Sequence, residues 1–315
     1  MRLGILADVH ANIDALEAVL RDGRGLVERW WFLGDALGRG PFPVETLQRL
    51  RQVVQSAHWR MGNHDLYVTG ALAADGVRPE DRFTYADHRV QLQAFRPTGR
   101  AALWAWCRRG WRLDRATPRR VATDAAEYWL VHASLGNEKH NVGDVPDSYL
   151  LPWRDDAYRR LLDEQLAQLN AQRAPARTAV LIHGHTHVPY LAVQRRGGTP
   201  HELGPIRYEE WQALAEFQAV LINPGSVGQP RNSDPRVHAA YGILDTANCA
   251  FMFRRVFYDS ERTRLKMAEL NYDRDYLIRQ LEGNHVHSAL RHTHALWLEW
   301  ERTYRAQPWG WEPIV

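Results

Sequence analysis

Short apolar runs alternate with segments of helical periodicity along the first part of this chain. Residues 3–9 (LGILADV) form one such run, and residues 12–20 follow with apolar side chains on one helical face and Asn12 in the N-cap position. The run at residues 29–35 (RWWFLGD) precedes a second helical pattern around residues 44–54. This repeated strand, turn and helix order predicts an α/β layered fold.

The same alternation continues towards the C-terminus. Two helical segments are expected between residues 85 and 109, and an amphipathic helix is expected over residues 155–172. Runs rich in β-branched and aromatic residues predict strands, and a helical pattern begins near residue 260. These strand-like runs are EYWLVHAS (127–134), TAVLIHGHTH (178–187), AVLINPGSVGQPRN (219–232), AAYGILD (239–245) and CAFMFRRVFYD (249–259).

The chain has 315 residues, a length that allows one large domain or two smaller ones. Its Gly/Pro-rich loops are too short to separate independent domains. We therefore expect one domain over residues 1–283 and a helical, Trp-rich C-terminal extension over residues 284–315. A Trp-rich surface is typical of an interface, so this extension either packs on its own domain or forms a contact between subunits of a homo-oligomer.

Composition excludes several classes of protein. Lys plus Arg number 40 against 37 for Asp plus Glu, and a net charge of +3 is too small to attract nucleic acid or a membrane by bulk electrostatics. No apolar stretch approaches the ~20 residues of a membrane span, and the N-terminus lacks the apolar region of a signal peptide. With two cysteines, a disulfide framework is not expected. A cytoplasmic protein without a membrane partner is the expectation.

Carboxylates, amides and imidazoles stand where the predicted strands end. In open α/β sheets, ligands bind outside the carboxyl ends of the strands, so groups far apart in sequence can converge on one crevice. The candidate residues are Asp8, His10, Asp35, Asn63, His64, Asp65, His132, His185 and His187.

Mixed carboxylate and imidazole donors favour Mn, Fe, Zn or Ni, whereas Mg or Ca would favour an all-oxygen set. Glycines directly precede Asp35, Asn63 and His185, and we expect these glycines to let the backbone turn sharply. If two ions lie about 3.5–4 Å apart, a bridging carboxylate is needed, and Asp35 is the natural bridge.

The ordered series D-x-H, GD, GNHD, a lone His and GHTH resembles the calcineurin-like metallophosphoesterase superfamily. The resemblance runs from about residue 3 to about residue 284, and NPGSVGQPRNSDPR and YGILD look like the bacterial subgroup of small phosphoesterases. It implies an α/β fold built as a four-layer α/β/β/α sandwich of two mixed β-sheets flanked by helices. The C-terminal extension lies beyond the resemblance.

The resemblance also implies a binuclear metal-dependent hydrolase with two divalent ions, among which Mn is expected to support activity. In the implied mechanism, a hydroxide between the ions attacks phosphorus in line, His64 protonates the leaving oxygen and Asp65 orients or charges the His64 ring. The implied ligands are Asp8, His10 and His187 for one ion, Asn63, His132 and His185 for the other, and Asp35 for both.

Three further features have two interpretations each. Arg39, in GDALGRGP, either grips a substrate phosphate, as the Arg of the similar GDxxDRG pattern does in phosphoprotein phosphatases, or is a solvated loop residue. His183 is expected in the core or behind the ligands rather than on a metal. Near the C-terminus, a surface helix face is a better interpretation than a second metal site for His285, His287, His292 and His294.

The leading functional hypothesis is hydrolysis of a phosphodiester whose substrate is a small or cyclic nucleotide. The expected binding partner is therefore a small phosphoester substrate. Arg39 instead favours a phosphomonoesterase or phosphoprotein phosphatase, because a guanidinium suits a terminal phosphate. A non-catalytic scaffold of the same fold is a third hypothesis, although no expected ligand is missing from the sequence. A nuclease is disfavoured by the balanced charge.

Overall fold

A computed structural model describes residues 1–74, 77–95, 118–135, 141–142, 145–146, 150, 156–197, 201–231 and 237–272. The C-terminal extension, its four histidines and the second helical segment expected before residue 109 lie outside these residues. In the part of the chain that is described, no helix is both long and apolar enough to cross a membrane.

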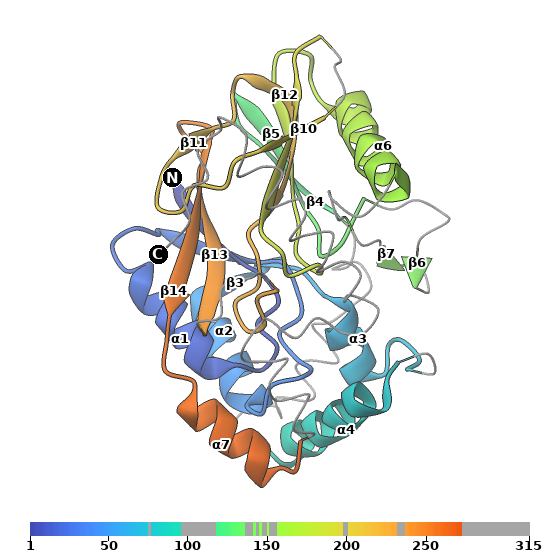
Figure 1. The fold of residues 1–315 in the computed structure, drawn as a ribbon, viewed down its shortest axis with the longest axis vertical. Helices are drawn as coiled ribbons and strands as arrows, with labels where there is room; N and C mark the ends of the chain where they lie inside the picture. The colour runs from blue at the N-terminus through green and yellow to red at the C-terminus, as the bar shows by residue number, and fades with distance from the viewer. Residues whose placement is uncertain are drawn as a thin grey trace.

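The first of two large sheets has six strands in the order β11-β14-β13-β1-β2-β3 (Figure 1). Strands β1, β2 and β3 run parallel to one another, whereas β13 pairs antiparallel with β1 and with β14. The strands are β1 (Arg2–Leu6), β2 (Arg29–Phe32), β3 (Val54–Trp59), β11 (Gln212–Ala213), β13 (His238–Asp245) and β14 (Ala250–Phe257).

The second sheet also has six strands, in the order β10-β9-β12-β8-β5-β4. Its central strands β5, β8 and β12 are parallel, and its outer strands pair antiparallel. The strands are β4 (Arg119–Ala122), β5 (Ala126–Leu130), β8 (Thr178–Ile182), β9 (Tyr190–Arg195), β10 (Glu202–Gly204) and β12 (Phe217–Asn223). A separate two-stranded sheet joins β6 (Asn141–Val142) to β7 (Val145–Pro146).

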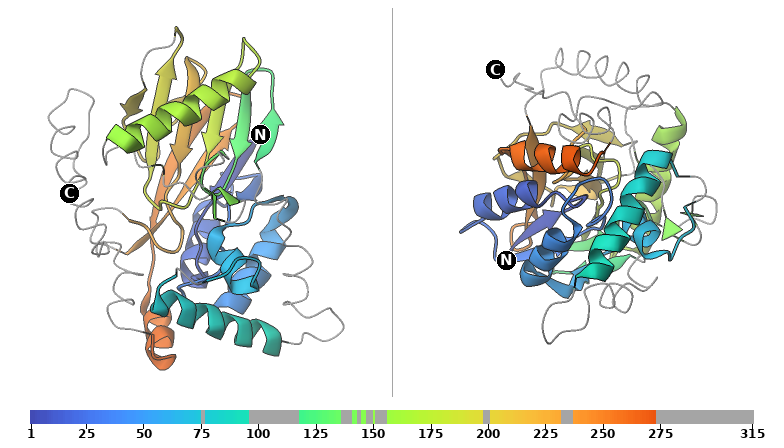
Figure 2. Two further views of the ribbon diagram at one scale, coloured as in Figure 1. Left: turned by 90° about the vertical axis from the view of Figure 1, so that its right-hand side faces the viewer. Right: turned by 90° about the horizontal axis from the view of Figure 1, so that it is seen from below.

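Three of the described helices cover the outer faces of the two sheets. Figures 1 and 2 show α1 and α2 beside the first sheet and α6 across the second. The described helices are α1 (Ile13–Asp22), α2 (Pro43–Val53), α3 (Asn63–Thr69), α4 (Pro79–Ala94), α6 (Asp156–Gln172) and α7 (Glu261–Glu269). In α1, the Asn12 side chain accepts a hydrogen bond from the Ala15 amide, which confirms the expected N-cap.

Three layers of apolar side chains hold the sandwich together. One lies between the first sheet and its helices and includes Leu16 and Phe32. A second lies between the two sheets, where Ile5 and Ile182 are fully buried. A third joins the second sheet to α6, which buries Leu166. Two mixed sheets with helices outside them confirm the predicted α/β/β/α order.

The parallel strands place their carboxyl ends at one edge of the sandwich. In the first sheet, β1, β2 and β3 end just before the segments that begin at Ala7, Leu33 and Arg60. Backbone hydrogen bonds from Asp8 to Gly34 and from His10 to Asp35 continue the pairing past the strand ends. The loops that carry the candidate residues are therefore tied to each other as well as to their strands.

Candidate metal centre

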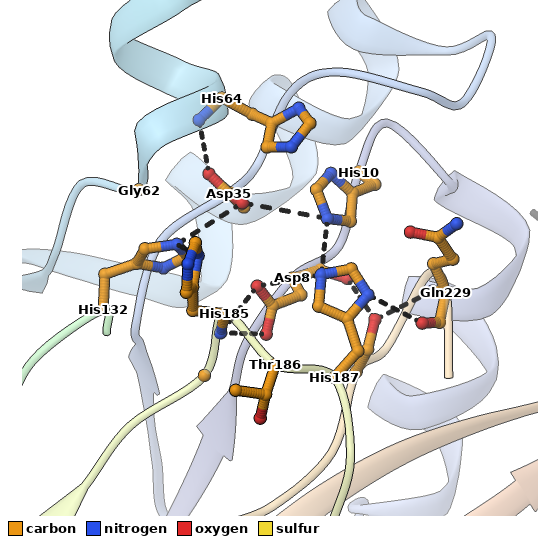
Figure 3. A network of polar contacts seen from close by, with 12 residues as sticks. Asp8, His10, Asp35, Gly62, His64, His132, His185, Thr186, His187 and Gln229 are labelled. Atoms are coloured by element: carbon orange, nitrogen blue, oxygen red, sulfur yellow. Dashed lines mark hydrogen bonds and ion pairs between the residues drawn. The ribbon is translucent and has the colours of Figure 1, made fainter. Parts of the chain in front are cut away.

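The predicted ligands meet where these strand ends converge (Figure 3). The donor atoms form two groups, and within each group all of them lie within 4.8 Å of one another. Asp35 belongs to both groups. One group, the Asp8 cluster, contains Asp8, His10, Asp35 and His187; the other, the His132 cluster, contains Asp35, His132 and His185. Every residue of both clusters is buried.

Asn63 joins the His132 cluster from the first residue of α3. Its side-chain oxygen Oδ1 lies 3.1 Å from Nε2 of His132, which in turn lies 3.4 Å from Oδ2 of Asp35. All seven residues expected as ligands are thus brought together, and Asp35 occupies the shared position.

Left-handed backbone conformations place these side chains. The φ angles are 54° at Asp8, 49° at His10, 60° at Asp35, 66° at His185 and 63° at His187. Non-glycine residues adopt positive φ rarely and at a cost of about 1–3 kcal/mol each, and such strain clusters at functional sites. The fold therefore maintains an unfavourable backbone at most of the candidate ligands.

The sequence predicted a sharp backbone turn at each of Gly34, Gly62 and Gly184, but the structure gives most of these glycines a different role. Only Gly34 among these three has positive φ, at 110°. A side chain at Gly62 would overlap the Asp35 carboxylate, and a Cβ at Gly184 would lie 2.5 Å from Oδ2 of Asp8. Gly62 and Gly184 allow close packing against the carboxylates, while the site residues themselves make the turns.

The imidazoles are oriented with ring nitrogens facing the clusters. A backbone carbonyl can only accept a hydrogen bond, so a ring nitrogen that contacts one must carry the proton. Nδ1 makes this contact in His10, His132 and His187, with the carbonyls of Leu37 (3.0 Å), Leu33 (3.1 Å) and Gln229 (2.8 Å) respectively. Nε2 of each neutral ring then presents a lone pair to the cluster, which is the orientation that metal-binding histidines require.

This orientation brings electron-rich atoms close together, which is favourable only if a cation binds between them. Nε2 of His10 and Nε2 of His187 lie 3.1 Å apart, and when both rings are neutral two lone pairs face each other. Oδ1 of Asp8 lies 3.4 Å from the same His187 nitrogen. A positive ion would relieve this repulsion by accepting electron density from all three atoms.

The pKa shifts reflect the burial of carboxylates and imidazoles next to one another. Burial raises the pKa of the Asp8 carboxyl to about 7, and the negative charge of Asp35 adds to this rise against the opposing effect of His132. Burial lowers the pKa of His132, but the charges of Asp35, Asp8 and Asp65 together outweigh burial and raise it to about 9.

His64 lies beside the Asp8 cluster at the start of α3. Its ring centroid is 4.8 Å from that of His10, and its backbone amide donates to Oδ1 of Asp35 at 2.9 Å. Burial lowers the pKa of His64, and the nearby charge of Arg39 lowers it further. Nδ1 of His64 lies 2.9 Å from the Tyr85 hydroxyl.

The expected role of Asp65 in orienting His64 is not what the structure shows. The Asp65 carboxylate accepts hydrogen bonds from the backbone amides of Asp35 (2.9 Å), Leu37 (3.0 Å) and Gly62 (3.2 Å). Consecutive residues of a helix point about 100° apart, so neighbours in GNHD do not face each other. Asp65 instead ties the Asp35 loop to α3, and Tyr85 contacts the His64 ring.

Arg39 is mostly buried, which contradicts the solvated-loop interpretation. Its side chain is 12% exposed, its Nη1 donates to Oε1 of Gln229 at 2.6 Å, and its Nε lies 3.7 Å from Oδ1 of Asp81. Gln229 also accepts from His187 through its backbone carbonyl. The guanidinium is therefore fixed beside a candidate metal ligand.

Sequence reasoning missed Gln229, Tyr85 and Arg231. The Arg231 amide donates to the His187 carbonyl at 3.2 Å, and after burial its charge is the next cause that lowers the pKa of His187. Gln229 and Arg231 lie in the GSVGQPR segment, where the pairing of a glutamine and an arginine after a strand end was the available signal.

His183 lies in the core, as expected. Its Nε2 lies 2.6 Å from the Tyr190 hydroxyl and its Nδ1 lies 3.0 Å from the Gly184 carbonyl. Burial lowers its pKa to about 3, so the ring is neutral. It belongs to neither cluster of candidate ligands.

Comparisons with known proteins agree with this geometry. The sequence profile of the calcineurin-like phosphoesterase superfamily domain matches residues 1–248. The crystal structure of a metallophosphoesterase from Sphaerobacter thermophilus is similar, with a TM-score of 0.64 and 29% identity over 90% of this chain and 99% of that one. An uncharacterized protein of Methanocaldococcus jannaschii is 26% identical over 85% of this chain and 92% of its own length.

A shorter similarity points to one group of named enzymes. A symmetrical bis(5'-nucleosyl)-tetraphosphatase of Psychromonas ingrahamii is 38% identical over 66 residues, which are 20% of this chain and 24% of that protein. The profile match covers most of the chain and includes every candidate ligand. The chain therefore belongs to the calcineurin-like phosphoesterase superfamily, and this membership supports a hydrolase activity and the binding of divalent metal.

Proposed function

We propose that this protein is a metal-dependent phosphoesterase that hydrolyses a small substrate with a terminal phosphate. The observation that carries this proposal is the fixed position of Arg39 beside the Asp8 cluster, where Gln229 contacts both Arg39 and His187. A guanidinium binds two phosphate oxygens in a planar, bidentate way.

The Asp8 cluster would hold one cation, and the His132 cluster with Asn63 would hold the other. When bound, two divalent cations would stabilise the charge that develops on the phosphoryl oxygens and would make the attacking water more acidic. Asp35 would keep the two sites together because its carboxylate is the donor that both clusters share. Mn, Fe, Zn or Ni remain the expected metals, and Mn is the one we propose for activity.

The residues around the clusters have separate tasks in this proposal. His64 would donate a proton to the leaving oxygen, a contribution of about 10²–10⁴-fold for a well-placed acid. Arg39 would hold the phosphate oxygens, and Gln229 would keep the guanidinium in place through the 2.6 Å hydrogen bond. Arg231 would add positive charge on the His187 side of the site.

The two arginines shift the expected substrate class. The subgroup resemblance in the sequence favours a phosphodiester, which carries one negative charge. A terminal phosphate carries up to two, and two guanidiniums beside two cations are suited to that larger charge. We therefore rank a phosphomonoester above a small or cyclic nucleotide diester. A phosphorylated protein is a special case of the same chemistry.

A nucleoside polyphosphate is a second candidate substrate, because of the local similarity to symmetrical bis(5'-nucleosyl)-tetraphosphatases. Such a compound also presents several charged phosphate oxygens to arginines. The scaffold interpretation is disfavoured, since the expected donors lie together and Nε2 of His10, His132 and His187 faces the clusters.

Initial rates with three substrates test the proposal on Mn²⁺-loaded protein. p-Nitrophenyl phosphate represents monoesters, bis-p-nitrophenyl phosphate represents diesters, and diadenosine tetraphosphate represents nucleoside polyphosphates. We expect hydrolysis, with the highest kcat/KM for the monoester. The highest kcat/KM for the tetraphosphate, which has a nucleoside at each end and no terminal phosphate, would instead support the second candidate. A strong preference for the diester would restore the sequence-based hypothesis, and no turnover of any phosphoester at full metal occupancy would support the scaffold.

Partner and location proposals are consistent with this function. A small phosphoester in the cytoplasm, without nucleic acid or membrane as partner, remains the expectation from composition. A homo-oligomer formed through residues 284–315 also stays a prediction, which the size-exclusion mass of the chain truncated after Gly283 would test.

A further inference from the structure

Helix α4 buries a polar face against the candidate site. Its buried residues include Asp81, Thr84, Tyr85 and His88, which occupy positions i, i+3, i+4 and i+7 of the helix. Residues at such spacings lie on one side of a helix. Because burying polar groups costs free energy unless they are hydrogen-bonded, each of them needs a partner across this contact.

Three residues of this polar face hold the loop that carries Arg39. Nδ1 of His88 accepts from the Gly38 amide at 3.2 Å, while its Nε2 donates to the Gly40 carbonyl at 2.7 Å. Burial lowers the pKa of His88 to about 4, so a neutral ring makes both bonds. Thr84 accepts from the Arg39 amide at 3.4 Å, and Asp81 lies beside the guanidinium.

The fourth residue, Tyr85, contacts the candidate general acid directly. Its hydroxyl lies 2.9 Å from Nδ1 of His64, and its ring is 5.5 Å from the His64 ring at an edge-on angle of 81°. Tyr67 stacks on Tyr85, with centroids 5.7 Å apart, and its ring also lies edge-on to His64. With 2% exposure, Tyr85 is held in place by the packing around it.

Gly38 leaves room for this contact. A Cβ at position 38 would lie 2.6 Å from Nδ1 of His64, so any side chain there would displace the ring. Gly38 also has a φ of 81°, which glycine adopts at little cost. The loop therefore passes close to the His64 ring without providing a side chain of its own, and the hydroxyl from α4 reaches Nδ1.

We propose that Tyr85 is the positioning residue for His64, and that its hydroxyl holds Nδ1 so that Nε2 faces the leaving oxygen of the substrate. This inference rests on the proposed function, in which His64 protonates that oxygen. A hydroxyl can both donate and accept, so it can hold the ring whether Nδ1 carries a proton or not. Tyr85 itself does not touch the substrate in this proposal and acts through His64.

Tyr85→Phe removes the hydroxyl and keeps the ring stacking. We expect kcat for phenyl phosphate to fall about 10–100-fold, by analogy with the loss when the partner that orients a metal-binding histidine is removed, while KM and bound Mn²⁺ stay unchanged. The loss should be smaller for p-nitrophenyl phosphate, because a good leaving group needs less help from an acid. In a His64→Ala background the same substitution should have no further effect.

Tyr67→Phe is the matched control, because Tyr67 stacks on Tyr85 and has the same chemistry. We expect it to keep both the rate and the leaving-group dependence. An equal loss of kcat in Tyr67→Phe, or a Tyr85→Phe loss that is the same for both leaving groups, would overturn the proposal. So would a normal rate for Tyr85→Phe.

A spectroscopic measurement separates this inference from the proposed function. In protein labelled with ¹⁵N-histidine, the His64 ring nitrogens are assigned by their loss in His64→Ala. We expect Tyr85→Phe to shift the Nδ1 resonance of His64 and Tyr67→Phe to leave it in place. If wild-type protein turns over no phosphoester, the proposed function fails, whereas an unmoved Nδ1 resonance in Tyr85→Phe would refute the contact itself.

Discussion

Two regions meet at this site, and they are built in different ways. The Asp8 and His132 clusters gather side chains from the ends of strands that are far apart in the sequence, such as Asp8 and His187. The polar face of α4 comes from one helix, between Asp81 and His88. The clusters depend on sheet topology and strained loops, whereas the helix depends on spacing alone. We infer that the first region fixes the metals and the second fixes the groups that act on the substrate.

The largest expected effect tests whether the two clusters are one unit. Asp35→Ala removes the donor that both share, so both cations should be lost. Several kcal/mol of charge stabilisation per cation corresponds to a loss of at least about 10⁴-fold in kcat/KM. Metal content by mass spectrometry and initial rates would check this.

Asp163→Ala is the control for this change, because Asp163 lies on α6 with 52% of its side chain exposed and pairs with His201. It should retain metal and activity. If Asp35→Ala kept one full equivalent of metal, the clusters would be independent sites rather than one centre.

The sequence predicted the ligand clusters better than it predicted the polar face of α4. The polar residues at the ends of the predicted strands indicated nine candidates for one crevice, because ligands bind outside the carboxyl ends of such strands. The resemblance to the calcineurin-like superfamily implied which seven of them are ligands. The backbone that places them was not predictable from the pattern. Positive φ at His10 and His185, for example, is imposed by the surrounding fold on residues that do not prefer it.

The second largest effect separates metal binding from chemistry. His64→Ala should lower kcat by about 10²–10⁴-fold and leave bound metal unchanged, because His64 belongs to neither cluster of donors. Steady-state rates and metal content of the same preparation would show this. His201→Ala, a histidine paired with Asp163 away from the clusters, should behave as wild type. Loss of metal in His64→Ala would place this residue with the ligands instead.

The polar face of α4 was not predicted, and the reason is physical. Helices are recognised in a sequence by apolar residues at helical spacing, and the buried face of α4 has Asp81, Thr84 and His88 in those positions. Such residues usually indicate a solvated face. Their partners, including the amide of Gly38 and the carbonyl of Gly40, are backbone groups that no motif names.

A variant with an intermediate expected effect tests whether the guanidinium of Arg39, which Asp81 of α4 contacts, binds the substrate phosphate. Arg39→Ala removes the guanidinium that Asp81 and Gln229 hold in place. A hydrogen bond to a charged group contributes about 1.5–3 kcal/mol, so kcat/KM for p-nitrophenyl phosphate should fall about 10–100-fold. Bound metal should not change, and the diester should be affected less than the monoester. An equal loss for both would remove the reason for ranking the monoester first.

The smallest expected effect tests the helix itself. His88→Leu removes the two bonds that hold Gly38 and Gly40, and each buried backbone group left unpaired costs about 1–3 kcal/mol of folding stability. Looser placement of the loop should lower kcat by about 10-fold, because small misplacements of positioning groups are costly in rate. Metal content should stay constant, since no candidate ligand contacts His88 among the hydrogen bonds described for it.

His88→Gln shows whether the loss in His88→Leu comes from the missing hydrogen bonds or from the changed shape of the side chain. Its amide group can still accept from Gly38 and donate to Gly40, so kcat and the midpoint of thermal unfolding should recover in part. A fully active His88→Leu variant would mean that α4 is only packing for the loop. Loss of metal in His88→Leu would mean that the two regions are coupled, because a change confined to the helix would then have reached the strand-end clusters. The expected pattern, a lower rate at full metal occupancy, arises only if the helix positions the loop of Arg39 independently of the metal ligands.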